Sequence, residues 1–199
     1  MSRRLIIIGC GGHGRVCAEI AETMYEEVYF LDDNPKDDSI GCVSDYGKYI
    51  NFDFFVAIGD NKTRKKITES LKGANIVSLV HKDAYVSPTA IIGKGTVVMA
   101  GAVVNTNTVL GEGTIVNTLS SIDHDCTIGD YSHVAVGAHI AGGCAVEDLC
   151  LIGAGSVIIN NINVCSGTVI GAGAAVVKNI IEPGTYVGVP ACKYGKKYE

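Results

Sequence analysis

The sequence predicts a small α/β domain followed by a long parallel β-helix, and three observations lead to this fold. An aliphatic residue recurs at every sixth position from Val86 to Val176. A small residue recurs with the same step, two positions before each aliphatic one. Residues 4–80 lack this step and alternate short apolar runs with polar stretches. We therefore expect two domains, residues 1–82 and residues 83–199.

The six-residue step is strict. Every aliphatic position from Val86 to Val176 is Val, Ile or Leu, and only Ile162 interrupts the small residues. A helix repeats its apolar face every 3.6 residues, so this step excludes a helix. Short strands joined by tight corners fit the step, because each strand then sends one aliphatic side chain inward. Three strands make a coil of 18 residues, so residues 18 apart stack at about 4.8 Å.

Residues 86–175 fill five such coils without an insertion, which predicts one continuous core. Glycine often follows the aliphatic position, and we expect it to supply a positive φ at the corners. These glycines are Gly93, Gly111, Gly129, Gly153 and Gly171. Cys126, Cys144 and Cys150 fall in the row of small residues. We expect the eight cysteines to be reduced thiols that act as small core residues.

The N-terminal residues alternate predicted strands and helices, which indicates a small parallel sheet. The predicted strands are 5–8, 28–31, 52–58 and 76–80, and the predicted helices are 15–25 and 62–72.

The first strand runs into a glycine loop, in which Gly9, Gly11 and Gly14 form a G-x-G-x-x-G pattern. Backbone N–H groups of such a loop, at a helix N-terminus, can bind a phosphate. Asp32 follows at the distance where an acidic residue binds a ribose hydroxyl. The pattern alone suggests NAD, but this Rossmann-like domain is too short for both halves of a dinucleotide site. One nucleotide fits better, and a tight turn without any ligand is the alternative.

Composition excludes several classes of protein. With 47% hydrophobic and 19% charged residues, the chain is globular. A net charge of −5 argues against nucleic-acid binding. No apolar run is long enough to span a membrane, and we expect a cytoplasmic protein because the first apolar run is too short for a signal peptide. No C-x-x-C pair occurs, and we expect no metal.

Several stretches together resemble a known family, the sugar O- and N-acyltransferases that join a nucleotide-sugar-binding domain to a left-handed hexapeptide-repeat β-helix. Within that family the chain is most similar to the UDP-4-amino-sugar N-acetyltransferases of the bacillosamine pathway. The matching stretches are GCGGHG (9–14), FLDD (30–33), DFFVAIGDNKTRKKI (53–67), LVHKDA (79–84), NTLSSIDHDCTIGDYSHVAVGAHIAGG (117–143) and PGTYVGVPA (183–191).

This resemblance implies the left-handed coil, acetyl-CoA as co-substrate, a UDP-linked sugar, and a homotrimer with active sites between subunits. It makes His124 the general base and Asp125 the acid that orients it, with Asp123 as an alternative partner. The base would take a proton from the sugar's C4 amine during direct acyl transfer. The step of 18 residues places Gly142 over His124, which would leave space for the acetyl group.

The remaining expected contacts divide into two sets. The residues expected to bind the nucleotide sugar are Gly11, Gly12, His13, Gly14, Asp32, Asp33, Gly59, Asn61, Arg64 and Asn117. Those expected to bind acetyl-CoA are His133, Gly142, Gly143, Ala154 and Gly171. A helix cap is the alternative role for His13. We expect His133 and His139 at corners, the latter without a chemical role, and a solvated tail at Lys193, Lys196 and Lys197.

Two other functions fit the same sequence. One is an O-acetyltransferase for sialic acid or another sugar, which the family architecture also supports. The other is a trimer that binds a nucleotide sugar without catalysing a reaction.

Overall fold

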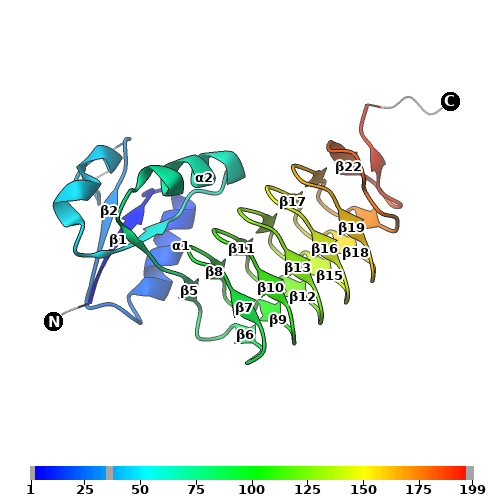
Figure 1. Ribbon diagram of the computed structural model, residues 1–199, viewed down its shortest axis with the longest axis horizontal. Helices are drawn as coiled ribbons and strands as arrows, with labels where there is room; N and C mark the ends of the chain where they lie inside the picture. Colours follow the sequence, from blue (N-terminus) through cyan, green and yellow to red (C-terminus); the bar gives the residue numbers. More distant parts are fainter. Residues whose placement is uncertain (1–2, 35–37, 196–199) are drawn as a thin grey trace. The chain divides into compact units, whose positions relative to one another are not determined.

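A computed structural model describes residues 3–34 and 38–195, so Lys196 and Lys197 lie outside the described residues. The chain forms two compact units, Met1–Val80 and His81–Glu199 (Figure 1). None of the helices in the described part has the length and apolar character that a membrane span requires.

The first unit is built on a parallel four-stranded sheet in the order β2-β1-β3-β4. Its elements are β1 (Arg4–Ile8), α1 (Gly12–Ala21), β2 (Glu27–Leu31), η1 (Val43–Tyr49), β3 (Asp53–Val56), α2 (Asn61–Ser70), β4 (Asn75–Ile76) and β5 (Leu79–Val80). Residues 5–8 of β1 are all buried, as in a central strand covered on both faces. One core cluster of this unit contains Ile6, Leu31 and Phe54, with Tyr46 of η1 packed against it.

Local bounds in this unit differ from the expected ones. Helix α1 begins at Gly12 rather than residue 15 and ends at Ala21, because the glycine loop itself takes the helical backbone. The 3-10 helix η1 was not predicted, since residues 43–49 carry no helical apolar repeat.

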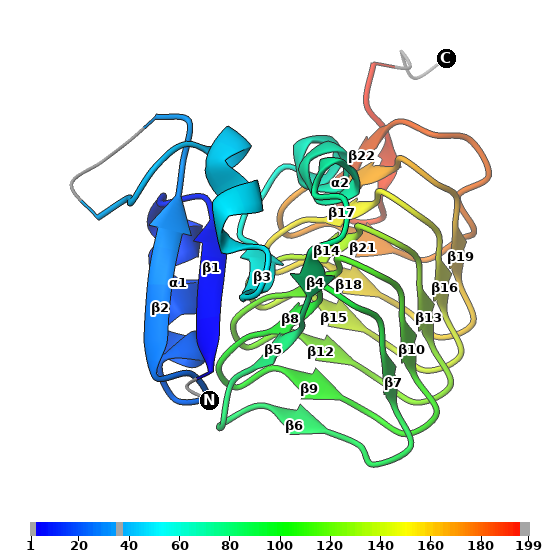
Figure 2. The ribbon, with the colours of Figure 1, turned by 60° about the vertical axis from the view of Figure 1, so that its left-hand side comes forward.

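The second unit is a parallel β-helix with three faces, and each coil contributes one strand to each face (Figure 2). The first face contains β8 (Val97–Val98), β11 (Ile115–Val116), β14 (His133–Val134), β17 (Leu151–Ile152), β20 (Val169–Ile170), β22 (Thr185–Val187) and β23 (Cys192–Lys193). The second face contains β6 (Tyr85–Val86), β9 (Val103–Val104), β12 (Ser121–Ile122), β15 (His139–Ile140), β18 (Val157–Ile158) and β21 (Ala175–Val176). The third face contains β7 (Ile91–Ile92), β10 (Val109–Leu110), β13 (Thr127–Ile128), β16 (Ala145–Val146) and β19 (Asn163–Val164).

The register confirms the 18-residue coil. Ser121 pairs with Val103 below it and with His139 above it, and the same step joins neighbouring coils on the other faces. At the C-terminal end β22 and β23 pair antiparallel, which closes the first face. Lys193 forms an ion pair there with Glu182 at 3.1 Å. The α/β domain followed by a β-helix, as expected from the sequence, is confirmed.

Glycines in the coils serve two different purposes. The positive φ expected at the glycines that follow the aliphatic residues occurs at other positions, so this prediction was wrong. Every sixth residue from Gly95 to Gly173 has a positive φ, whether or not it is a glycine. The five glycines that follow aliphatic positions, all of them described, lie outside this set. A Cβ at Gly129 would lie 2.5 Å from backbone of the next coil, so glycine is needed there for close approach.

The cysteines mostly behave as expected. Cys126, Cys144 and Cys150 are buried in the row of small residues of the β-helix. Cys10 and Cys17 are buried in the first unit, whereas Cys42 is exposed.

Candidate functional site

His124 lies on the edge between the second and third faces, two residues after β12. Its Nδ1 is 2.8 Å from Oδ2 of Asp125, and its side chain is 56% exposed. The Oδ1 of Asp123 instead accepts the backbone N–H of His124 at 2.8 Å. Of the two acids considered from the sequence, Asp125 is therefore the one placed to orient the imidazole.

The two carboxylates set the electrostatics of this edge. The hydrogen bond to Asp125, together with the negative charge of Asp123, raises the pKa of His124 above its ordinary value of 6.5. The same hydrogen bond, with a second one from Asn107, lowers the pKa of Asp125. Because Nδ1 faces an ionised carboxylate, the neutral ring holds its proton there and leaves the Nε2 lone pair free. This arrangement is suited to a general base.

Gly142 lies directly over His124, as the step of 18 residues predicted. A Cβ on Gly142 would be 2.7 Å from both Nε2 and Cε1 of the imidazole. The space left by the missing side chain is thus taken by the ring itself and not left open for an acetyl group. Open space continues beside the ring, in a groove of about 410 Å³ that is lined by Asp123, His124, Asp125, Ala141, Gly142, Gly143, Asn160 and Asn161.

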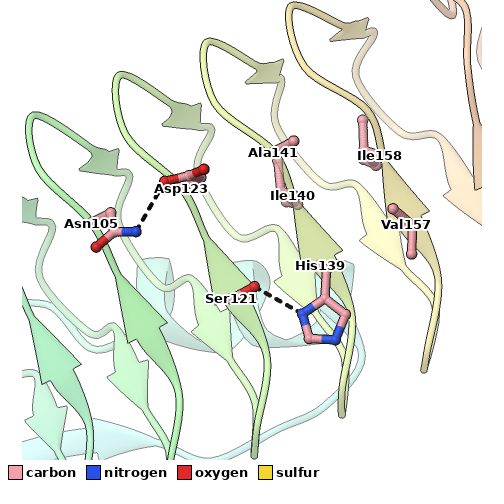
Figure 3. Close-up of a pocket in the computed structure, with 8 residues that line it drawn as sticks. All are labelled: Asn105, Ser121, Asp123, His139, Ile140, Ala141, Val157 and Ile158. Carbon is pink, nitrogen blue, oxygen red and sulfur yellow. Dashed lines mark hydrogen bonds between the residues drawn. The ribbon is translucent and has the colours of Figure 1, made fainter.

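A second groove, of about 310 Å³, lies on the neighbouring second face and shares Asp123 and Ala141 with the first. Asn105 donates to Asp123 at 2.9 Å there, and Ser121 Oγ lies 2.8 Å from His139 Nδ1 (Figure 3). His139 is the first residue of β15 and His133 the first residue of β14, so neither histidine lies at a corner. The first strand residue points outward because the second carries the inward aliphatic side chain.

Asn117 and His133 lie together on another part of the β-helix. The Asn117 amide is 3.0 Å from His133 Nε2, at the edge between the first and second faces. Ala154 and Gly171 follow strands of the first face and lie on that same edge. The single chain therefore gathers its expected catalytic and ligand-binding residues on two different edges of the β-helix.

The first unit brings its expected residues to one end of its sheet. Backbone hydrogen bonds join the loops that follow the parallel strands, from Gly9 to Leu31 at 2.9 Å and from Ala57 to Ile8 at 2.8 Å. Gly11 and Gly12 face open space, whereas a Cβ on Gly14 would collide with the Gly9 carbonyl oxygen. Gly11 and Gly12 thus expose backbone, and Gly14 allows close packing.

The acidic pair after β2 is already engaged within the protein. Asp32 accepts the backbone N–H of Cys10 at 2.7 Å and that of Asn34 at 2.8 Å. Asp33 accepts the N–H of Val43 at 2.9 Å. Both carboxylates therefore hold the loops around the glycine cluster, and Asp32 fixes the loop directly.

Arg64 also shapes a loop. It is 1% exposed, and its guanidinium donates to the carbonyls of Ile58 and Gly59 at 2.8 and 3.0 Å. It also donates to Asn61 Oδ1 at 2.9 Å. These bonds hold the loop between β3 and α2, so Arg64 supports that loop from beneath the surface.

His13 is not a helix cap, because Gly11 is the N-cap of α1 and no side chain caps it. Its Nε2 lies 3.8 Å from Cys17 Sγ. Burial, and secondarily the positive charge of Arg64, lowers the pKa of His13 to about 4. The ring is consequently neutral near pH 7 and can either donate or accept a hydrogen bond beside the glycine loop.

The site contains residues that the sequence reasoning missed. Asn105 and Asn107 contact the two aspartates from the coil below, and Asn160 and Asn161 line the groove above Gly142. The 18-residue coil could have identified all four from the sequence, because they lie one coil before residues 123 and 125 or one coil after residues 142 and 143. Among the residues that the structure describes, no group of three His, Cys, Asp or Glu side chains is placed to hold a metal ion.

Comparison with known proteins assigns the two units to one family. Residues 4–71 match the family model described as the PglD N-terminal domain. The acetyltransferase domain of PglB from Neisseria gonorrhoeae is 40% identical, with a TM-score of 0.93 over 96% of this chain and 99% of that one. A mutant of GDP-perosamine N-acetyl transferase from Caulobacter crescentus, solved with CoA and GDP-perosamine, is 31% identical, with a TM-score of 0.92 over 96% of this chain and 97% of that one.

Curated relatives match over shorter stretches. The UDP-N-acetylbacillosamine N-acetyltransferase of Bacillus subtilis is 32% identical over 112 residues, which cover 49% of this chain and 52% of that protein. A second match, Uncharacterized protein L142 of Acanthamoeba polyphaga mimivirus, is 33% identical over 49% of this chain but only 21% of that protein. The near-complete match to solved acetyltransferase structures nevertheless shows that this chain belongs to the sugar N-acetyltransferase family that joins a PglD-type N-terminal domain to a parallel β-helix.

Proposed function

We propose that this protein transfers the acetyl group of acetyl-CoA to the C4 amine of a UDP-linked 4-amino-4,6-dideoxy sugar. The observation that carries the proposal is the His124–Asp125 pair, with Nδ1 held at 2.8 Å and Nε2 beside an open groove. Support for the ligands comes from relatives, since one solved structure of the PglB domain holds acetyl coenzyme A. UDP is proposed because the Bacillus subtilis relative is named for a UDP-linked sugar, while the Caulobacter crescentus structure holds a GDP-linked one, so the acceptor panel below includes both.

The reaction follows from the chemistry of these groups. The amine nitrogen attacks the thioester carbonyl carbon, a C–N bond forms, and the C–S bond breaks when the tetrahedral intermediate collapses. His124 Nε2 accepts the proton that the nitrogen loses, while the Asp125 carboxylate stabilises the imidazolium. The proton then passes to the departing CoA sulfur, which leaves as the thiol. The transfer is direct, and the neutral amides of Asn160 and Asn161 in the groove add no charge that would compete with the base.

In the first unit, we assign the exposed backbone of Gly11 and Gly12 to the phosphates of the nucleotide sugar. His13, Gly14, Asp32, Asp33, Gly59, Asn61 and Arg64 complete or support this site. Neutral His13 is suited to a hydrogen bond with a hydroxyl or phosphate oxygen beside the loop.

The protein acts as a homotrimer in this proposal. His133 and Asn117 lie on a different edge of the β-helix from His124, so one chain alone does not unite the expected residues. A symmetric neighbour that presents its Asn117 edge to the His124 edge would unite them, with Ala154, Gly171, Gly142 and Gly143 along the acetyl-CoA path.

The substrate assignment is tested by thiol release from acetyl-CoA with a panel of acceptors. The panel contains a UDP-linked 4-amino-4,6-dideoxy sugar, a GDP-linked 4-amino sugar and free sialic acid. We expect the highest kcat/KM with the UDP-linked amine. Preference for the GDP-linked sugar would overturn the nucleotide assignment, and turnover of sialic acid alone would indicate an O-acetyltransferase. No release with any acceptor would favour a binding protein without catalysis.

Mixing two variants tests the shared site. His124→Ala and His133→Ala should each be strongly impaired, and co-refolded mixtures should recover about a quarter of wild-type activity, since mixed trimers restore some intact interfaces. Failure of the mixture to recover, in a preparation where an affinity tag on one variant captures the other in the same trimer, would exclude a site shared in this way.

A further inference from the structure

Asn107 contacts the His124–Asp125 pair from the coil below. Asn107 Nδ2 donates to Oδ1 of Asp125 at 3.1 Å, while Oδ2 of the same carboxylate meets His124 Nδ1 at 2.8 Å. We propose that Asn107 is a positioning residue, which acts on His124 by holding the Asp125 carboxylate in the plane where it meets the imidazole. This inference rests on the proposed function, in which His124 is the base.

The carboxylate needs such a partner because packing does not hold it. The Asp125 side chain is 57% exposed, so water competes for both oxygens, and without a second partner the carboxylate would be free to rotate. A hydrogen bond to the oxygen that does not face the ring selects one rotamer without competing for the imidazole. The amide is also neutral, so it donates without adding a charge beside the base.

Asn107 is itself anchored from the coil below. Its backbone N–H donates to Thr89 Oγ1 at 3.0 Å, and that hydroxyl lies 2.7 Å from the hydroxyl of Thr106. The backbone N–H of Asp125 donates to the Thr106 carbonyl at 3.0 Å. A chain of hydrogen bonds therefore runs from Thr89 through Asn107 and Asp125 to His124.

The amide of Asn105 holds the other aspartate of the site in the same way, through a hydrogen bond from the coil below. Asn105 donates to Asp123 (Figure 3). Asp123 in turn accepts the backbone N–H of His124. One coil thus supplies two amides to two carboxylates of the next, one fixing the main chain of His124 and the other its ring.

The backbone conformation offers a second explanation for an asparagine at residue 107, and an experiment must distinguish it from the positioning role. Its φ is 57°, and asparagine tolerates this left-handed backbone better than most residues. Glycine occupies most of the equivalent corners, including Gly95, Gly101 and Gly113, so glycine at residue 107 keeps the backbone and removes only the amide. If asparagine serves φ alone, Asn107→Gly is silent.

The experiment compares Asn107→Gly with Leu149→Gly, which makes the same kind of change at a φ of 58° on another edge. NMR titration follows His124, whose resonances are assigned by their loss in His124→Ala, and kinetics supply kcat and KM. For Asn107→Gly we expect a kcat lower by about tenfold to a hundredfold, a small change in KM, and a His124 pKa moved toward 6.5. Leu149→Gly should leave the kinetics and the titration unchanged.

The charged groups that face His124 from its own coil are Asp123 and Asp125, while Asn105 and Asn107 below and Gly142 and Asn160 above are neutral. Because Asn107 donates to Asp125, a change in the His124 titration on Asn107→Gly substitution reports the Asp125 contact. An unchanged His124 titration in a folded Asn107→Gly variant would overturn the inference. Wild-type protein that turns over no acceptor would instead overturn the proposed function, and the titration would still test the Asn107 contact.

Discussion

The two units offer ligands different parts of the polypeptide. In the β-helix the backbone repeats every 18 residues, and the groove is distinguished by side chains that project from one edge, such as His124 and Asp125. In the first unit the exposed group is the main chain itself, at Gly11 and Gly12, where a Cβ would meet no atom within 4 Å. The surrounding side chains of Asp32 and Arg64 are used to hold that main chain.

The difference teaches how to interpret a glycine in this protein. Where a Cβ would strike backbone, as at Gly14 and Gly129, the glycine is needed for packing. A Cβ on Gly12 would meet open space and a Cβ on Gly142 would meet the His124 ring, and we propose that these two glycines serve a ligand and the base. Alanine substitutions at these four glycines test this division.

The largest effect is expected for the side chain on which the β-helix site depends. His124→Ala should lower kcat by about 10² to 10⁴, because proton transfer by a positioned base contributes about that much. His139→Ala is the matched control, since it removes an exposed histidine from the adjacent face, and it should retain near wild-type kcat. Steady-state kinetics measure both, and a His124→Ala variant with normal kcat would show that the base lies elsewhere.

In the first unit, the packing glycine should matter most for stability. Gly14→Ala should lower the free energy of unfolding by about 3 kcal/mol, because its Cβ collides with the Gly9 carbonyl, which cannot move independently of the loop. Gly12→Ala should change it by less than about 1 kcal/mol, since its Cβ meets open space. It should instead raise KM for the nucleotide sugar. Denaturant unfolding and kinetics separate the two, and similar stability losses in both variants would contradict the division.

A smaller effect is expected where a glycine faces the imidazole. Gly142→Ala places a methyl group where the ring of His124 lies, so the ring should turn away and kcat should fall by about tenfold to a hundredfold. The exposed ring can move, so stability should be nearly unchanged. Gly129→Ala should do the reverse, with lost stability because its Cβ strikes the next coil, and little change in kcat for the folded fraction. Equal behaviour of the two variants would argue against a distinct role for Gly142.

The smallest expected effect is a shift in the pH dependence of kcat/KM. A base works when it is unprotonated, so the acid limb of the kcat/KM profile should lie above 6.5, the ordinary pKa that Asp125 and Asp123 raise in His124. Asp125→Asn removes the negative partner while asparagine tolerates the φ of 58°, so this limb should move down toward 6.5. A limb that stays in place would mean that Asp125 does not set the protonation of the base.

The sequence predicted the β-helix more closely than the first unit, for a physical reason. Each coil repeats one local rule, so the step of 18 residues placed Gly142 over His124 before any coordinates. The start of α1 and the helix η1 depend on loop contacts that leave no period in the sequence. The engagement of Asp32 with Cys10 was likewise hidden, because a carboxylate that binds a ligand and one that binds its own backbone have the same spacing.

Coil length limits how this protein can vary in sequence. The groove joins residues 123–125, 141–143 and 160–161, and Asn105 and Asn107 hold its aspartates from the coil below. These residues are neighbours only because four successive turns have equal length. A one-residue insertion between 107 and 142 would shift one wall against the other, unless it bulged outward at a corner. Duplication of a whole turn after residue 175 would lengthen the β-helix beyond the groove and leave the residues that line the groove in place.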